Sequence, residues 1–318
     1  MNYCSIGIWK VHIFLGAFSI LLRVYLLLLQ AQAQTARGES TVKRCGISAG
    51  DVEYTVLQIK NSRVVQFPFP HIYVAKVFRD ELYDCILGNI VDTTSTPEFY
   101  FNPYADYPQR YILNLKGRKH SVIRRAAIDN SKRNFWIEFG RLFGDHMVAN
   151  ELLSKFSETL EKRNVRNTTT RHHYQLQLTR DLRGYSIPPH TDTPQKLVTT
   201  LFYLPRKFDN VSKYGTQLLS VRSEQNFRNL SRKHNYNARG SHMPLKMWEE
   251  AVRSGALSVD YQAKFEPNSM IGFSPCVDAW HAVARVPKGK NTQIRRDTLQ
   301  GFVKAPRLSP ASLKLGSC

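Results

Sequence analysis

The stretch IPPHTDTPQKLVTTLFYLP, residues 187–205, places a histidine and a carboxylate two positions apart, just ahead of a β-branched, apolar run. In a β-strand, residues i and i+2 point to the same face, so His190 and Asp192 present an imidazole and a carboxylate side by side. Pro188 and Pro189 stiffen the approach and hold the preceding residue extended. The pair can clamp a metal ion at two points, although the pattern H-x-D alone also arises by chance.

A third ligand is supplied by DAWHAV, residues 278–283, on a later predicted strand. There His281 follows Trp280 and is surrounded by small residues. Two histidines and one carboxylate on one face of an ion, with the other positions open, form the facial triad of non-haem iron(II) oxygenases. We therefore expect His190, Asp192 and His281 to be the metal ligands and the catalytic centre, with the open face free for a chelating cosubstrate and O₂.

An anchor for such a cosubstrate follows in IRRDTLQGFV, residues 294–303, where Arg295 and Arg296 begin an alternating strand. A guanidinium can hold the far end of a dicarboxylate with two parallel hydrogen bonds. Arg296 shares a strand face with Thr298, whose hydroxyl can assist, and Tyr203 is a plausible second donor. Two adjacent arginines are also consistent with a basic surface, but their position shortly after His281 favours the anchor.

Taken in order, the chain reads H-x-D, a strand ending Phe-Tyr-Leu, G-T-x-L-L, P-N-x-M-I-x-F, W-H-x-V and R-x-T-L. This ordered set resembles the 2-oxoglutarate- and Fe(II)-dependent dioxygenases, in particular their prolyl-4-hydroxylase-like branch. The segment PFPHIYVAKVFRDELYDCIL, residues 68–87, is similar to the leading strand and helix of that branch. The resemblance covers residues 64–305.

The resemblance implies a mainly β fold with flanking helices (α+β), built on a double-stranded β-helix, or jelly-roll, core. It implies that His190, Asp192 and His281 bind Fe(II), and that Arg296 binds the C5 carboxylate of 2-oxoglutarate with help from Tyr203 and Thr298. O₂ is the second cosubstrate, and ascorbate is a candidate reductant. The implied reaction hydroxylates a C–H bond and releases succinate and CO₂. Related halogenases carry a small residue at the carboxylate position, so an aspartate there favours hydroxylation.

Two departures from the family pattern matter. The gap between His281 and Arg296 is longer than usual, which leaves Arg295 as an alternative anchor. Residues 220–263 form a long basic insert, which we interpret either as a lid or substrate-facing loop or as a solvated decoration. It carries aromatic residues among its cations, and its histidines, His234 and His242, are expected at the surface.

The rest of the chain divides by composition and periodicity. A largely apolar run at residues 11–29 predicts a signal or membrane anchor, despite an internal arginine that is costly in a bilayer. If residues 1–33 are part of the working protein, this run predicts a membrane-anchored or secretory protein; otherwise the expected location is the cytoplasm. The predicted organisation is a targeting segment over 1–40, a linker over 41–63, the dioxygenase domain over 64–305 with helical support over 75–165 and the jelly-roll core over 172–305, and a basic tail over 306–318.

Charge and cysteine usage limit the other functions. A net charge of +20 suits an anionic partner such as nucleic acid or a membrane surface, and equally a merely soluble basic surface. The five cysteines have no paired spacing, which argues against a zinc site and a dense disulfide framework but leaves one bridge open. The substrate stays unidentified: a small molecule, a sugar or a peptidyl residue. The alternatives are a nucleic-acid demethylase of the same chemistry and a non-catalytic jelly-roll binding protein.

Overall fold

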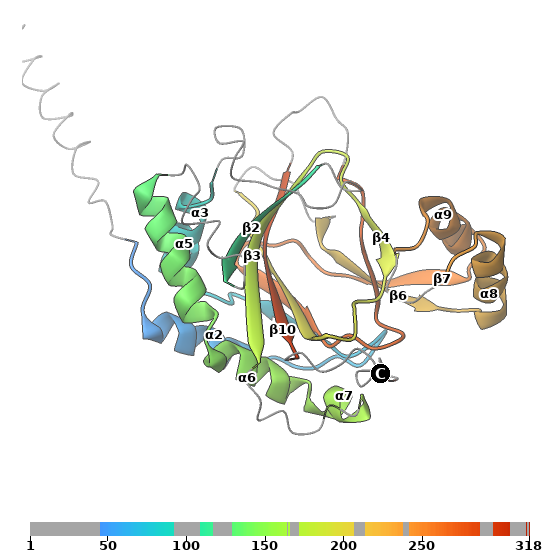
Figure 1. Cartoon of the computed structure of the whole chain (residues 1–318), viewed down its shortest axis with the longest axis horizontal. Helices are drawn as coiled ribbons and strands as arrows, with labels where there is room; N and C mark the ends of the chain where they lie inside the picture. The colour runs from blue at the N-terminus through green and yellow to red at the C-terminus, as the bar shows by residue number, and fades with distance from the viewer. Residues whose placement is uncertain are drawn as a thin grey trace, which may run out of the picture. The chain divides into compact units, whose positions relative to one another are not determined.

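The computed structural model describes residues 45–91, 109–116, 129–163, 165, 172–206, 214–237, 242–286, 295–305, 316 and 318. Within these residues the strands form two antiparallel sheets, one of six strands and one of four (Figure 1). The strands are β1 (His71–Ala75), β2 (Arg110–Lys116), β3 (His173–Leu182), β4 (Ile187–His190), β5 (Lys196–Tyr203), β6 (Thr216–Val221), β7 (Leu257–Gln262), β8 (Ser269–Phe273), β9 (Trp280–Val283) and β10 (Arg295–Lys304).

The order of the strands is that of a jelly roll. The six-stranded sheet runs β1-β8-β5-β10-β3-β2, and the four-stranded sheet runs β4-β9-β6-β7. From β3 onward the chain crosses repeatedly between the two sheets, as in a double-stranded β-helix. The fold class predicted from the sequence is therefore confirmed. Among the described residues no hydrogen-bonded strand pair joins the two sheets, so they face each other without closing into a barrel.

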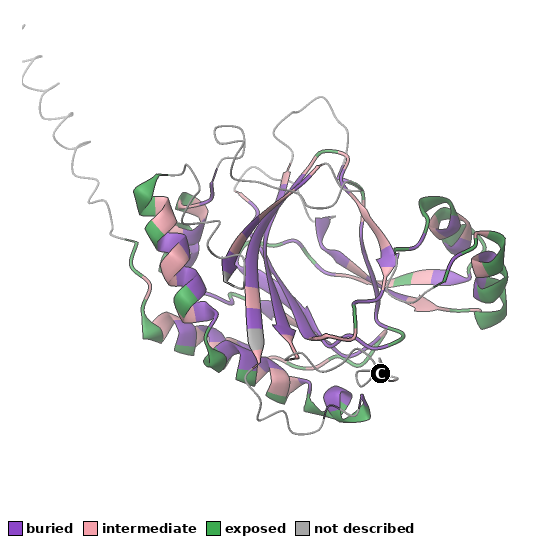
Figure 2. Ribbon diagram, in the orientation of Figure 1, coloured by how far each residue is buried: buried purple, intermediate pink, exposed green. Residues whose placement is uncertain are grey.

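Helices cover one face of the six-stranded sheet. They are α2 (Ala49–Asn61), α3 (Asp80–Gly88), α5 (Asn130–Phe143), α6 (His146–Lys155) and α7 (Ser157–Lys162). In α5, Phe135, Trp136, Phe139 and Phe143 recur at helical spacing and are buried against the sheet. Figure 2 shows this division, with buried faces toward the strands and exposed faces outward. Of these helices, α3, α5, α6 and α7 lie within residues 75–165.

Two elements differ from the sequence prediction. The stretch assigned to a linker over 41–63 contains helix α2, which begins with a capping box between Ser48 and Asp51. Its buried residues Val52, Thr55 and Ile59 recur at helical spacing, and two of them join the main hydrophobic cluster. The second difference is strand β2, which lies in the region expected to be helical and pairs with β3 at the sheet edge.

The two faces of the six-stranded sheet have different chemistry because strand residues alternate in direction. Leu299 and Val303 of β10 face the helices and belong to the apolar cluster there. The alternate residues of β10 face the other sheet: Arg296, Thr298, Gln300 and Phe302. Their register partners on β3 are likewise polar: Asp181, Thr179, Gln177 and Gln175. The inner face is thus polar under β2, β3 and β10. Under β5 and β8 it is largely apolar.

The insert over residues 220–263 is ordered where it is described. Helices α8 (Glu224–Lys233) and α9 (Leu245–Arg253) pack on the outer face of the four-stranded sheet, beside β6 and β7 (Figure 1). The ring of Phe227 meets that of Trp280 edge-to-face at 5.4 Å between centroids. Phe227, Tyr236 and Trp280 are therefore core residues of this subcluster.

The cysteines are more often paired than their spacing indicates. Cys276 is bonded to Cys318, and Cys45 and Cys85 are also disulfide-bonded. The expected anchor at residues 11–29 lies outside the described residues, as does most of the basic tail over 306–318. In the described part of the chain, no helix combines the length and the apolar character needed to cross a bilayer.

Candidate active site

His190 and His281 face each other across an antiparallel strand pair. His190 is the last residue of β4, and its register partner on β9 is His281. Residues directly opposite on an antiparallel pair point to the same side, so the two imidazoles project together between the sheets. Their ring centroids are 4.2 Å apart.

Asp192 completes a three-residue cluster. It follows β4 by two residues, and its Oδ2 lies 3.9 Å from Nε2 of His281. One ligand atom from each of His190, Asp192 and His281 lies within 4.8 Å of the other two. The structure therefore brings together the three side chains expected from the sequence, in a group able to hold one metal ion.

Backbone carbonyls orient both imidazoles. Nδ1 of His190 donates to the carbonyl of Pro188 at 3.0 Å, and Nδ1 of His281 donates to that of Ala279 at 3.0 Å. Each ring therefore keeps Nε2 unprotonated in its neutral form. Burial lowers the pKa of both histidines, so the neutral, metal-binding form is favoured.

Asp192 is held by two residues of the following strand. Thr199 Oγ1 donates to Oδ2 at 2.6 Å, and the Lys196 ammonium contacts Oδ1. Burial opposes ionisation of this carboxyl, but Lys196 and the two nearby histidines outweigh it and hold the pKa of Asp192 well below its usual range. The carboxylate is thus charged and fixed in orientation, as a metal ligand requires.

Arg296 lies on the inner face of β10 and is completely buried. Its Nε donates to the carbonyl of Tyr214 at 2.6 Å, and its Nη1 donates to Asp181 Oδ2 at 2.8 Å. Arg110 binds the same carboxylate through two hydrogen bonds, of 2.7 and 2.9 Å. Nη2 of Arg296 is buried and has no hydrogen-bond partner among the described residues. Two guanidinium groups thus share the Asp181 carboxylate, and Arg296 keeps one buried donor without a partner among the described residues.

Of the other residues predicted to bind the cosubstrate carboxylate, Tyr203 and Thr298 lie on the inner face with Arg296, whereas Arg295 does not. Tyr203 reaches across to the four-stranded sheet, where its hydroxyl donates to Thr216 Oγ1 and accepts from Thr216 N, both at 3.0 Å. The Arg296 guanidinium carbon lies 5.8 Å from the Tyr203 ring centroid. Thr298 is the register partner of Tyr203, but its hydroxyl is bonded to that of Thr179 at 2.5 Å. Arg295 points to the opposite face, where its Nε lies 3.6 Å from Asp297 Oδ2.

Arg163, which the sequence did not single out, braces the segment that carries Asp192. It is 3% exposed and donates to the carbonyls of Pro194, Lys196 and Leu197 at 2.9, 3.1 and 3.4 Å. It also donates to Ser274 Oγ at 3.3 Å. Burial lowers the pKa of Arg163 to about 10, although Asp192 opposes this. No local pattern could reveal this residue, because its partners lie some thirty residues or more away in sequence.

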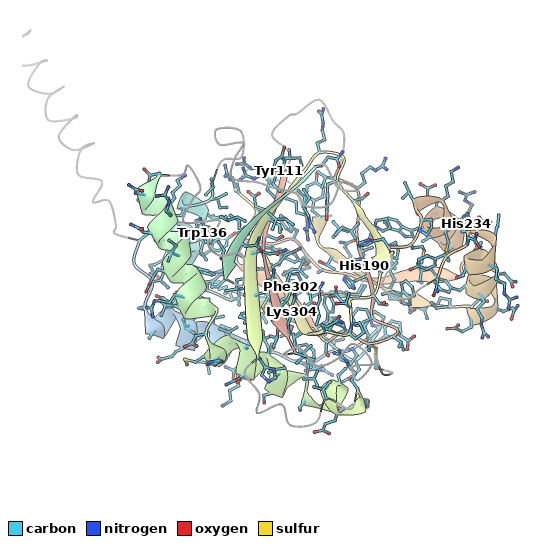
Figure 3. All side chains as sticks on the ribbon, viewed as in Figure 1. Tyr111, Trp136, His190, His234, Phe302 and Lys304 are labelled. Atoms are coloured by element: carbon cyan, nitrogen blue, oxygen red, sulfur yellow. A yellow bond between two sulfur atoms is a disulfide. The ribbon has the colours of Figure 1, made fainter. Side chains whose placement is uncertain are left out.

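His242 is exposed, as expected from the sequence, but it also lies beside the candidate site. Its ring centroid lies 4.5 Å from that of His190. The next residue, Met243, is buried, and its backbone N–H donates to the carbonyl of Pro189 at 2.9 Å. This part of the insert therefore lies against β4 beside the candidate metal ligands. The other insert histidine, His234, pairs with Glu250 at 2.9 Å (labelled in Figure 3).

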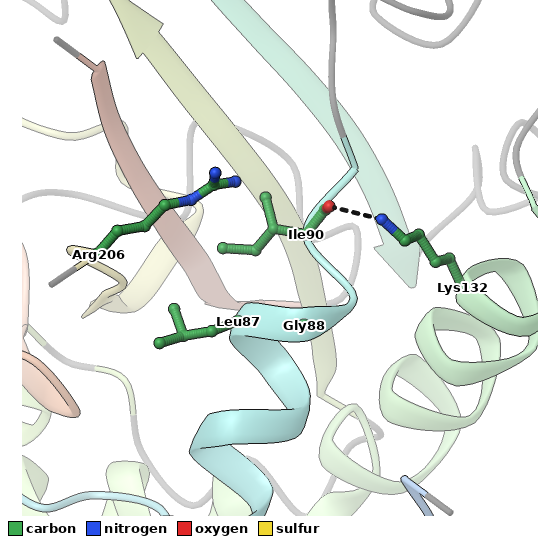
Figure 4. A pocket seen from close by; sticks show the side chains of 5 residues that line it. All are labelled: Leu87, Gly88, Ile90, Lys132 and Arg206. Carbon is green, nitrogen blue, oxygen red and sulfur yellow. Dashed lines mark hydrogen bonds between the residues drawn. The ribbon is translucent and has the colours of Figure 1, made fainter. Parts of the chain in front are cut away.

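A surface cavity of about 470 Å³ lies away from these residues (Figure 4). It is lined by Leu87, Gly88, Ile90, Lys132 and Arg206. The Lys132 ammonium donates to the Ile90 carbonyl at 3.2 Å, and none of the residues discussed above contributes to its lining.

Comparison with known proteins gives likenesses only in structure. No family model matches the sequence, and no curated protein matches it. A prolyl-4-hydroxylase from Pseudomonas putida is 8% identical with a TM-score of 0.42, over 79% of this chain and 99% of that one. A Trichoplax adhaerens prolyl hydroxylase, solved with a peptide fragment of the hypoxia inducible factor oxygen degradation domain, is 9% identical with a TM-score of 0.41, over 80% and 90%.

A third similar structure is an oxidoreductase of the 2OG-Fe(II) oxygenase family from Burkholderia pseudomallei. It is 13% identical with a TM-score of 0.37, over 86% of this chain and 95% of that one. At these identities and TM-scores, the similar structures carry no argument about the activity of this protein. What the site can do follows from its own residues.

Proposed function

We propose that this protein is an Fe(II)- and 2-oxoglutarate-dependent dioxygenase that hydroxylates a C–H bond of its substrate and releases succinate and CO₂. One observation carries the proposal. Two imidazoles and a carboxylate converge between the sheets, and the same interior holds a buried guanidinium, Arg296, with an unpaired donor. A buried donor without a partner is costly in a purely structural interior, so the unpaired Nη2 of Arg296 favours a bound anion.

The donor set fits a ferrous ion. Nε2 of His190, Nε2 of His281 and a carboxylate oxygen of Asp192 would hold the ion on one face and leave the opposite face open. Thr199 and the two backbone carbonyls behind the histidines would fix these ligands in place. When bound, the ion supplies the activation of O₂ and the oxidative decarboxylation of the cosubstrate.

The cluster at Arg296 fits one carboxylate of 2-oxoglutarate. A carboxylate there would accept a hydrogen bond from the unpaired Nη2 and form an ion pair with the buried Arg296 guanidinium. Arg295 faces away from this position, so the proposal assigns the anchor to Arg296. Tyr203, whose ring centroid lies 5.8 Å from the Arg296 guanidinium carbon, is a second donor, and its hydroxyl also bonds Thr216.

The register of the four-stranded sheet relates the metal ligands to the Tyr203 hydroxyl. His281 lies opposite Leu218, and Thr216, which meets the Tyr203 hydroxyl, is two residues from Leu218 on the same face. Two residues along a strand span roughly 7 Å. A five-carbon diacid can bridge that span, from the metal ligands to Tyr203 and Arg296. Leu218, Leu201 and Val283 belong to the apolar cluster around this path and would exclude water from it.

The test measures succinate formed from 2-oxoglutarate with Fe(II) and O₂, together with anaerobic Co(II) binding. Asp192→Ala removes the carboxylate ligand and should abolish both readouts. Glu266→Ala removes an exposed carboxylate near β8 and should leave both unchanged. Undiminished succinate formation by Asp192→Ala would exclude the assignment. Metal binding without any 2-oxoglutarate turnover would favour the non-catalytic alternative.

A further inference from the structure

Two lysines lie beside the candidate iron ligands on the inner face of the six-stranded sheet. Lys196 begins β5 and Lys304 ends β10, and the two are register partners. The Lys196 ammonium is 4.3 Å and the Lys304 ammonium 5.7 Å from the ring centroid of Phe302. Figure 3 labels Phe302 and Lys304 together on β10, with His190 across the interior.

The Phe302 ring connects these lysines to the metal ligands. Phe302 is the register partner of Thr199, the residue that donates to Asp192. Side chains directly opposite on an antiparallel pair lie about 5 Å apart and share a face. The Phe302 ring therefore lies beside the residue that holds the Asp192 carboxylate, and the ammonium groups of Lys196 and Lys304 lie beside that ring.

Amide side chains continue this surface away from the metal. Lys304 Nζ donates to Gln175 Oε1 at 2.7 Å, and Gln177 Nε2 donates to Gln300 Oε1 at 2.9 Å. Gln175 in turn donates to Asn114 at 3.4 Å. We call this surface the lysine–amide floor: Lys196, Lys304, Phe302, Gln175, Gln177, Gln300 and Asn114.

The floor carries a positive charge, that of Lys304, which no carboxylate among the described residues pairs with. Lys196 is paired with Asp192, whereas the partner of Lys304 is a neutral amide, and no described carboxylate forms an ion pair with it. Lys304 is half-buried, and an unpaired cation in a partly desolvated space is costly.

We propose that the lysine–amide floor binds an anionic group of the substrate, a carboxylate, phosphate or sulfate, through Lys304, with the amides holding the neutral oxygens next to it. This rests on the proposed function, since it places the hydroxylated carbon between the metal and Lys304. The long side chain of Lys304 is a flexible point charge, which suits a single anionic oxygen cluster more than a planar bidentate contact. The substrate therefore carries a carboxylate, phosphate or sulfate group.

The experiment is equilibrium dialysis of the full chain, saturated with Co(II) and 2-oxoglutarate, against labelled phosphate, sulfate and acetate in separate arms. Saturating 2-oxoglutarate blocks Arg296, so bound anion reports on the floor. Lys304→Gln should bind the preferred anion at least tenfold more weakly, and Lys304→Met, which keeps an apolar stem against Phe302, should do the same. Lys304→Arg should retain most of the affinity, and Lys264→Gln, at an exposed lysine, should bind as the unaltered protein does.

Equal anion binding by the unaltered protein and both neutral variants would overturn the proposal, as would no binding of any of the three anions or an equal loss in Lys264→Gln. Co(II) and 2-oxoglutarate binding are measured on the same samples. If these fail while anion binding still depends on Lys304, the anion subsite stands and the dioxygenase proposal falls. If they succeed and anion binding is independent of Lys304, the reverse holds.

Discussion

His190 and His281 are directly opposed residues of β4 and β9, and each donates its Nδ1 hydrogen to the carbonyl of the residue two positions earlier in the chain. The strand register brings the two rings together, and the backbone sets their tautomer. Both ligands are thus oriented by the fold without a metal ion. Asp192 lies just beyond β4, so its position depends on the residues that hold the loop between β4 and β5.

The first prediction concerns the hydroxyl that fixes Asp192. Thr199→Val keeps the shape of the side chain but removes the donor to Oδ2. We expect the dissociation constant for Co(II) to rise about tenfold, because residues that orient metal ligands typically contribute 10–100-fold in affinity. Isothermal titration calorimetry under anaerobic conditions measures the change.

Thr200→Val is the matched control for that measurement. Thr200 is the next residue of β5 and points to the opposite face, where its hydroxyl meets Tyr174 at 3.1 Å and the Gly301 carbonyl at 3.3 Å. We expect this variant to lose about 1 kcal/mol of unfolding free energy and to bind Co(II) as the unaltered protein does. Equal Co(II) affinities for the two variants would show that Thr199 does not hold the carboxylate ligand.

The second prediction separates the two adjacent arginines. Arg296→Gln removes the guanidinium with the orphaned donor, and Arg295→Gln removes one that faces the other side of β10. We expect the first to weaken 2-oxoglutarate binding about 100-fold, since hydrogen bonds to charged groups contribute 1.5–3 kcal/mol each. The second should leave it within a factor of two. A larger effect of Arg295→Gln would transfer the anchor to that residue.

The third prediction concerns the brace behind Asp192. Arg163→Met leaves the carbonyls of Pro194 and Lys196 without their buried donor. We expect a loss of roughly 2–3 kcal/mol of unfolding free energy, measured by urea denaturation, and a weaker Co(II) site. Arg163→Lys keeps the charge but cannot reach all of the carbonyls. Its unfolding free energy and Co(II) affinity should therefore lie between those of the unaltered protein and those of Arg163→Met. If both variants bind Co(II) normally at a temperature where they are folded, Arg163 stabilises the fold without positioning the ligand.

The three candidate metal ligands can be predicted from the sequence because their signals are local and ordered. H-x-D places two side chains on one face of an extended segment, and the alternating strands that follow indicate a β-structure able to bring His281 back to them. The glycine before Thr216 also has a local reason: a Cβ there would overlap the backbone of Ala263. Asn268 of P-N-x-M-I binds both backbone groups of Phe78 and so ties the leading strand and helix to the core.

What the sequence could not supply depends on strand register and on which face turns inward. Asp181 meets Arg110 and Arg296 only because β3 lies between β2 and β10. Lys304 reads as part of a basic C-terminal region until its strand places it beside Phe302. His242 belongs to a hydrophilic insert, and only the contact between Met243 and Pro189 brings it to the site. Such pairings are set by tertiary packing, which no local pattern encodes.

The fourth prediction is a pH dependence of stability that a histidine away from the metal ligands should produce. His71 is 1% exposed, its Nδ1 donates to the Phe69 carbonyl at 2.8 Å, and burial lowers its pKa. A histidine whose folded-state pKa is lowered binds fewer protons when folded than when unfolded. Its stabilising contribution is therefore present above the unfolded pKa of about 6.5 and is lost as the pH falls below that value.

Removing that histidine should make the stability curve flatter on the acid side. We expect the unfolding free energy of the chelator-treated protein to fall between pH 6.5 and pH 5 with a slope to which His71 contributes at most about 1.4 kcal/mol per pH unit. His71→Gln lowers the stability at pH 7.5 through lost packing, but its slope over this interval should be smaller than that of the unaltered protein. Urea titrations at half-unit pH steps measure both slopes. Parallel curves would mean that His71 binds a proton equally well in the folded and unfolded chains, and hence that its burial does not suppress its charge.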